Sequence, residues 1–78
     1  MQISGRDLIR LLEGDGWERV RTATHGVWLR KRVSNRTLHT TVKDTRKIIP
    51  ATTLGQILSL KQTGLGHAGL QRLLDGES

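Results

Sequence analysis

A histidine beside a strongly basic stretch is the feature of this sequence that points to chemistry. His25 lies in the run TATHGVWLRK, which leads directly into Arg30, Lys31 and Arg32. A histidine side chain ordinarily titrates near pH ~6.5, so it can take up and release a proton at neutral pH and accelerate a reaction by about 10²–10⁴-fold. RNA supplies its own nucleophile, the 2′-hydroxyl group, so one proton carrier flanked by cations is sufficient to cleave it slowly without a metal ion. The alternative, commoner for a lone histidine, is an exposed turn residue with no chemical role.

Other catalytic classes find little support in the sequence. The chain contains no cysteine, no cluster of acidic residues and no pair of histidines at metal-binding spacing, so a metal site is not expected. A serine nucleophile with histidine and acidic partners is likewise unsupported. We therefore expect a site without metal ion or cofactor.

The basic residues are concentrated in the middle of the chain. Thirteen lysines and arginines against seven acidic residues give a net charge of +6 and an isoelectric point near 11.2. The segment 19–47 holds nine basic residues and a single acidic one, Asp44, whereas the flanking segments are close to neutral. This distribution predicts one positive surface suited to a polyanion such as RNA, DNA or an acidic protein. A solvated sheet edge that resists aggregation would explain the same charges without a ligand.

Length and composition limit the organisation of the molecule. A chain of 78 residues with 35% hydrophobic content has room for one domain with a small core. No apolar run approaches the ~20 residues that span a bilayer, and the first residues lack the hydrophobic core of a signal peptide. We expect a cytoplasmic protein with no membrane partner.

Hydrophobic periodicity predicts an α+β fold. Ser4 is a candidate N-cap for an apolar helical stretch, and segments rich in β-branched and aromatic residues follow it. The expected elements are a helix over 5–13, strands over 17–23, 26–33 and 37–42, a helix that follows Pro50 with a capping box at Thr53 and Gln56 and ends at Gly64, and a short C-terminal helix and tail over 66–78. This order predicts a single domain over 1–78, with a three-stranded antiparallel sheet and both main helices on one of its faces.

The strand predicted over 26–33 raises a conflict about His25. Val27 and Leu29 share one side of this strand and are expected to face the helices. Strict alternation then places His25 on the core side as well. Either Gly26 marks a β-bulge that redirects the histidine, or the faces are reversed and Trp28 is the buried residue.

The other face of the sheet is expected to be basic and not covered by helices. It carries Trp28, Arg30 and Arg32 from one strand and His39 from the next. Two roles are open for Trp28, stacking on an unpaired base or packing in the core. His39 is either a second proton carrier or a solvated strand residue. His67 is expected to be a cap or loop residue.

The run SGRDLIRLLEGDGWERVRTATHGVWLRK resembles the opening half of HicA toxins, small ribonucleases of bacterial toxin–antitoxin pairs. The family pattern begins with Ser-Gly, a basic and an acidic residue and an apolar helix, and continues with Asp-Gly-Trp, Val-Arg and a histidine that opens the second strand. The residues that fill this pattern are Ser4, Gly5, Arg6, Asp7, Asp15, Gly16, Trp17, Val20, Arg21 and His25. TLGQIL, followed by Gly64 and Leu65, resembles the family's final helix, so the likeness covers about residues 3–65.

The resemblance implies a fold like that of double-stranded RNA-binding domains, with His25 as the catalytic residue. It also implies messenger RNA as the substrate and a HicB-like antitoxin as the partner. Four positions depart from the family pattern: Ala23-Thr24 replaces Gly-Ser, Lys43 replaces a second histidine and Thr52 replaces a glycine. The basic strands and the matched histidine together predict an RNA-binding surface that consists of Arg21, Thr24, Trp28, Arg30, Lys31, Arg32, His39 and Lys43.

Three functions are compatible with these residues. The first is a toxin that cleaves messenger RNA as a metal-independent endoribonuclease. The second is a catalytically silent RNA-binding module that uses the same face. The third, a DNA-binding accessory subunit, ranks last because the predicted helices carry too little basic charge on one face to enter the major groove.

Overall fold

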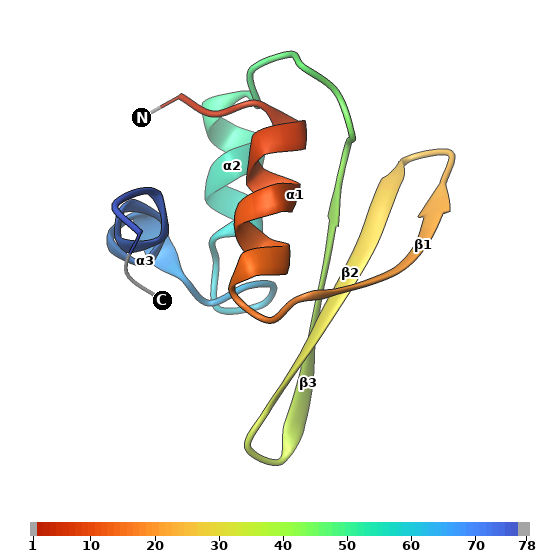
Figure 1. Cartoon of the computed structure of the whole chain (residues 1–78), viewed down its shortest axis with the longest axis vertical. Helices are drawn as coiled ribbons and strands as arrows, with labels where there is room; N and C mark the ends of the chain where they lie inside the picture. Colours follow the sequence, from red (N-terminus) through yellow and green to blue (C-terminus); the bar gives the residue numbers. More distant parts are fainter. Residues whose placement is uncertain (1, 77–78) are drawn as a thin grey trace.

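The computed structural model describes residues 2–76 as an α+β fold with one three-stranded sheet. The elements, in chain order, are α1 (Gly5–Gly14), β1 (Glu18–Ala23), β2 (Gly26–Val33), β3 (Arg36–Val42), α2 (Ala51–Ile57) and α3 (Gly66–Leu74). The strands lie in the order β1-β2-β3, and both neighbouring pairs are antiparallel. The predicted fold class and order of elements are therefore confirmed (Figure 1).

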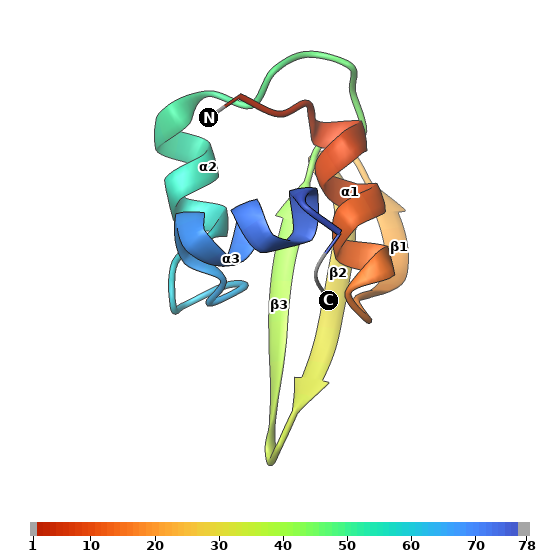
Figure 2. The same ribbon diagram turned by 60° about the vertical axis from the view of Figure 1, so that its left-hand side comes forward.

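The core lies between the helices and one face of the sheet. Figures 1 and 2 show the helices gathered on one side of the three strands. The largest fully buried side chains come from both layers and are Leu8, Ile9, Leu12, Val27, Leu29, Val42, Leu54 and Leu70. The start of α1 is held by its predicted cap, because the backbone N–H of Asp7 donates to Oγ of Ser4 at 3.1 Å. None of the helices among residues 2–76 packs against the other face of the sheet, which is called the open face below.

The second helix is shorter than predicted. α2 ends at Ile57, well before Gly64, because the chain that follows folds back onto the helix end. The backbone N–H of Thr63 and its hydroxyl both donate to the carbonyl of Ile57, at 3.0 and 2.7 Å, and the N–H of Gly64 donates to the carbonyl of Ser59 at 2.8 Å. These hydrogen bonds satisfy the carbonyl groups of Ile57 and Ser59, which would otherwise accept hydrogen bonds from the N–H groups of a further helical turn.

The predicted capping box of this helix is also wrong. α2 begins at Ala51, directly after Pro50, and no side chain caps its first turn. Thr53 and Gln56 therefore lie inside the helix. Proline has no backbone N–H, which removes one unpaired donor at the helix start, and residues 51–53 are exposed, so water can satisfy the others without a polar cap.

The β2–β3 hairpin continues beyond the end of β1. Pairing between β1 and β2 stops at Glu18 opposite Arg30, whereas β2 and β3 stay paired as far as Val33 opposite Arg36. Figure 1 shows this hairpin projecting past the helices. In the part of the chain that the structure describes, no helix is long and apolar enough to cross a membrane.

Candidate active site

His25 lies at the tip of the β1–β2 hairpin and is exposed to solvent. Ala23 pairs with Gly26, so Thr24 and His25 form the turn between the strands. Val27, the first buried residue of β2, is fully buried as predicted. The conflict over His25 thus disappears, because a turn residue is not bound by the alternation of the strand that follows it.

The backbone of Gly26 sets this turn against the end of β3. Its φ is 132°, a conformation that side-chain-bearing residues rarely adopt. A Cβ at this position would lie 2.7 Å from the carbonyl oxygen of Val42, too close for any real carbon atom. The positive φ and the close approach, rather than a β-bulge at Gly26, direct His25 outward.

His25 lines a cavity of about 540 Å³ together with two lysines, Lys43 and Lys47. Both lysines are exposed. The remaining lining consists of apolar residues from the end of β3, the segment 48–50 and Ile57, together with Thr41, Thr45 and Thr53. None of the described residues that line this histidine cavity is acidic.

The loop that carries the two lysines is held by backbone hydrogen bonds to the start of α1. The N–H of Arg6 donates to the carbonyl of Thr45 at 3.0 Å, and the N–H of Gly5 donates to the carbonyl of Lys47 at 3.3 Å. A Cβ at Gly5 would overlap the carbonyl oxygen of Lys43, so glycine is needed for this approach. The loop is therefore fixed by its main chain, and its lysine side chains remain available.

The acidic residue within the basic segment does not face the cavity. The carboxylate of Asp44 accepts a hydrogen bond from Nε of Arg6 at 3.1 Å. This pair holds the carboxylate toward α1, and the lining of the cavity carries Lys43 and Lys47 without an acidic residue among those described.

The open face of the sheet carries an aromatic and basic cluster. Nε1–H of Trp28 donates to Nδ1 of His39 at 3.2 Å, and the two ring centroids are 5.6 Å apart. The guanidinium carbon of Arg21 lies 5.5 Å from the centroid of the Trp28 ring, which is within cation–π range. Trp28 is half-buried by these neighbours and lies outside the hydrophobic core, so it does not have the core-packing role. Arg21, Trp28 and His39 are called the sheet-face cluster below.

Arg21 reaches this face because β1 is irregular. Arg19 is opposite Leu29 and Arg21 is opposite Trp28, so Val20 is an extra residue without its own partner. Such a bulge reverses the side on which the following residues point. Arg19, which precedes the bulge, lies opposite the buried Leu29 and pairs with Glu13 of α1 at 3.3 Å.

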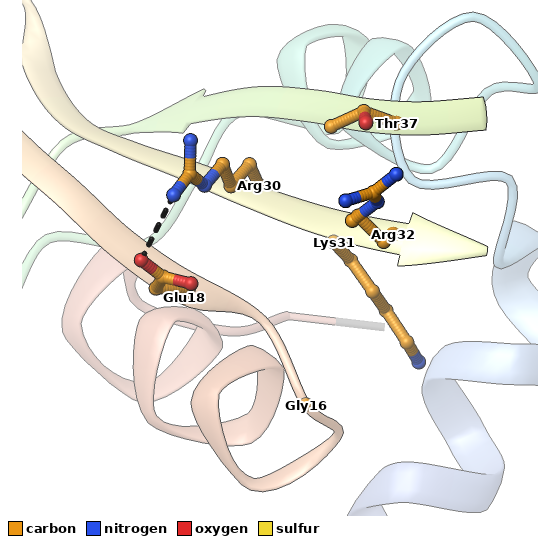
Figure 3. Close-up of a pocket in the computed structure, with 6 residues that line it drawn as sticks. All are labelled: Gly16, Glu18, Arg30, Lys31, Arg32 and Thr37. Carbon is orange, nitrogen blue, oxygen red and sulfur yellow. Dashed lines mark hydrogen bonds and ion pairs between the residues drawn. The ribbon is translucent and has the colours of Figure 1, made fainter.

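The predicted RNA-binding residues of β2 are divided between the two faces. Arg30 and Arg32 lie on the open face, where Arg30 pairs with Glu18 at 3.2 Å. Lys31 points to the helix side and its Nζ lies 3.1 Å from Oδ2 of Asp15. Figure 3 shows the Lys31 side chain leading away from those of Arg30 and Arg32 around a shallow pocket of about 450 Å³. Lys31 is thus separated from the other residues proposed to meet RNA.

The structure brings the predicted residues together in two places. Thr24, His25 and Lys43 lie at the end of the sheet where the β1–β2 turn meets the loop after β3. The sheet-face cluster, Arg30 and Arg32 follow along the open face. Lys47 was not identified as a site residue from the sequence. Its position depends on a backbone hydrogen bond from Gly5, more than forty residues earlier, and a contact over such a distance leaves no local sequence pattern.

Among residues 2–76, no group of three or more histidine, cysteine or acidic side chains is placed to hold a metal ion. The geometry offers instead a solvent-accessible imidazole beside two ammonium groups. An imidazole can carry a proton, and the ammonium groups can stabilise negative charge on a phosphate.

Comparison with known proteins places the chain in a family. Neither the curated proteins nor the solved structures contain a match to it. A family model, described as the HicA toxin of bacterial toxin–antitoxin systems, matches residues 5–65, which is most of the 78-residue chain. The matched range includes His25 and extends from the start of α1 to the residue before α3. The chain therefore belongs to the HicA toxin family and is the toxin component of a toxin–antitoxin pair.

Proposed function

We propose that this toxin is an endoribonuclease that cleaves messenger RNA without a metal ion, with His25 as the catalytic residue, and that a HicB-like antitoxin silences it. The observation that carries the proposal is the histidine cavity, where an exposed imidazole lies beside Lys43 and Lys47. An exposed turn histidine can lack a chemical role, so the two lysines that line the same cavity are the feature that supports catalysis.

The proposed reaction uses the 2′-hydroxyl of the RNA as nucleophile. His25 removes the proton of this hydroxyl as its oxygen bonds to the adjacent phosphorus. The bond from phosphorus to the 5′-oxygen breaks, and that oxygen leaves as a hydroxyl after receiving a proton from the imidazolium or from water. Lys43 and Lys47 stabilise the negative charge that builds up on the phosphoryl oxygens. The products are a 2′,3′-cyclic phosphate and a free 5′-hydroxyl.

The open face of the sheet holds the rest of the RNA in this proposal. Arg21, Arg30 and Arg32 supply cations for phosphates, and Trp28 supplies a ring for base stacking. His39 already accepts a hydrogen bond from Trp28, which favours a role in positioning this ring over one as a second proton carrier. Lys31 contributes least, because Asp15 holds it on the helix side.

Replacement of His25 tests the proposal. We expect His25→Ala to abolish RNA cleavage and growth arrest, because none of the other described side chains that line the cavity is an imidazole or a carboxylate that could take the proton of the 2′-hydroxyl. The variant should melt within about 4 °C of the wild type, since substitutions at exposed sites usually change stability by ~0.5 kcal/mol or less. His67→Ala, at an exposed histidine in α3, is the matched control and should cleave normally. Cleavage at the wild-type rate by His25→Ala would overturn the assignment, and a wild-type protein that binds RNA without cleaving it would favour the silent module.

The chemistry predicts a second result that does not depend on mutation. Cleavage should continue in excess EDTA, because the nucleophile belongs to the RNA and the cavity offers no acidic ligands. An oligonucleotide with 2′-deoxyribose at the cleaved position should remain intact, because it lacks this nucleophile. End analysis should find the 2′,3′-cyclic phosphate or its hydrolysed 3′-phosphate. Rapid cleavage of the deoxy substrate would require a different mechanism.

A further inference from the structure

The histidine cavity has more apolar lining than phosphate binding requires. Ile48, Ile49 and Pro50 contribute to it together with His25. Ile48 is 51% exposed, although isoleucine is among the residue types most often buried. An apolar surface placed beside a set of cations suits a ligand with an uncharged flat part and an anionic part.

The fold fixes Ile48 in this exposed position. The segment is extended, because Ser4 and Ile48 form an antiparallel bridge and the N–H of Ile49 donates to the carbonyl of Ile3 at 2.9 Å. Successive side chains of an extended segment point to opposite sides. Since Ile49 packs against the hydrophobic core, Ile48 must point away from it.

The volume of the histidine cavity and the charge of its lining indicate which class of ligand it binds. The cavity volume of about 540 Å³ lies within the range of sites that enclose small organic ligands, roughly 300–1,000 Å³. In the part of the chain that the structure describes, Lys43 and Lys47 take part in none of the salt bridges, so their charges are available to a phosphate. Thr41, Thr45 and Thr53 also line the cavity and offer hydroxyl groups to the polar edge of a base. A nucleotide matches all of these features.

We propose that the histidine cavity binds one unpaired nucleobase of the RNA substrate, from a nucleotide adjacent to the phosphate that is cleaved at His25. This inference rests on the proposed function. The base lies against Ile48 and Pro50, and its phosphate lies between Lys43 and Lys47. A base that is stacked and paired in a duplex cannot enter such a cavity without leaving the stack. The substrate class is therefore single-stranded RNA, and the cavity contributes to the choice of cleavage site.

The experiment removes the base and the isoleucine separately and together. The cleavage site of a single-stranded RNA is first mapped with wild-type protein, and an abasic ribose that keeps its 2′-hydroxyl is then placed on either side of the scissile phosphate. We expect the abasic sugar on one side to lower kcat/KM about ten-fold, chiefly through KM, because stacking of one base on a protein surface contributes on this order. Ile48→Ala should cause a similar loss on intact RNA and little further loss on that abasic RNA, since both changes remove the same contact.

Two variants control for effects on folding. Leu60→Ala changes another exposed hydrophobic residue, which is 82% exposed and does not line the cavity, and should leave kcat/KM unchanged. Ile48→Leu keeps the apolar contact and should retain most of the activity. Melting curves should show all three variants folded, because these side chains are largely solvated.

The outcomes separate this inference from the function on which it rests. Full-rate cleavage of both abasic RNAs, with cleavage still abolished by His25→Ala, would overturn the base site and leave the endoribonuclease intact. If Ile48→Ala leaves RNA cleavage unchanged but weakens inhibition by the antitoxin, the cavity serves the protein partner and the inference is also overturned. Cleavage that survives His25→Ala would instead remove the proposed function itself.

Discussion

At the scale of single residues, the position of His25 depends on Gly26. The turn residues Thr24 and His25 project from the sheet because the next residue adopts a φ of 132° and touches the backbone of β3 at Val42. A residue with a side chain would have to change the turn, move the end of β3, or both. The histidine and the cavity would then no longer face each other.

We predict that Gly26→Ala lowers the free energy of unfolding by about 1–3 kcal/mol, because it combines an unfavourable φ with a steric overlap. For a domain of this size each kcal/mol corresponds to a fall of roughly 4–8 °C in Tm. Gly55→Ala is the matched control, since Gly55 lies within α2 and a Cβ there meets nothing within 4 Å. It should raise stability by up to ~1 kcal/mol through helix propensity. Equal effects of the two substitutions on Tm would contradict this account.

Residue type and the family resemblance indicated His25 and Lys43 as candidate site residues, which remains a prediction, but they did not indicate on which side of the sheet each charge lies. The alternation of Val27 and Leu29 correctly predicted the buried face of β2. By the same alternation, the side chain of Lys31 points to the helix side, where it pairs with Asp15. Its charge had led to the prediction that it belongs to the RNA-binding surface. Lys47 could not be found from the sequence, because backbone contacts between distant segments place it.

At the scale of elements, strands were predicted more accurately than the second helix. The predicted bounds of β2, 26–33, agree with the structure, and those of β1 and β3 differ by one residue at one end. Strand ends are marked locally by turn residues such as Ser34, whose φ is 50°. The end of α2 depends on hydrogen bonds from Thr63 to Ile57, six residues earlier, and hydrophobic periodicity does not reveal such a non-helical turn. The bulge at Val20 likewise has no signal in the sequence, yet it moves Arg21 to the open face.

The open face of the sheet leads to a prediction about the two tryptophans. Trp17 is 4% exposed and belongs to the core, whereas Trp28 lies in the sheet-face cluster. Addition of single-stranded RNA should quench the fluorescence of Trp28, because a base that stacks on the ring changes its environment. The measurement uses a Trp17→Phe variant, in which Trp28 is the emitter, in a His25→Ala background that prevents cleavage. A Trp28→Phe variant reports Trp17 and serves as the control, which should respond little. Quenching confined to Trp17 would place RNA elsewhere.

At the scale of the whole molecule, acidic side chains neutralise the basic residues unevenly. Three salt bridges tie basic residues to the helices or to the loop beside them, and they join Arg6 to Asp44, Arg19 to Glu13 and Lys31 to Asp15. A fourth joins Arg30 to Glu18 on the open face. Within residues 2–76, nine of the thirteen basic residues take part in none of these pairs. Four of the nine, Arg21, Arg32, Lys43 and Lys47, lie at the histidine cavity or on the open face. These four side chains place positive charge from the histidine cavity along the open face, which is the path proposed for RNA.

This distribution predicts how salt affects the two proposed partners. A toxin that harms its own cell must be held inactive, and the most direct way is to cover the histidine cavity and the open face with the antitoxin. RNA and antitoxin should therefore compete in a gel-shift titration. If four cations contact phosphates, the logarithm of RNA affinity should fall with the logarithm of salt concentration with a slope of about −3, or about fifty-fold between 50 and 200 mM. The antitoxin complex should lose less, because apolar contacts such as those offered by Ile48 are not screened by salt. A ternary complex of toxin, RNA and antitoxin would show that inhibition acts through another surface.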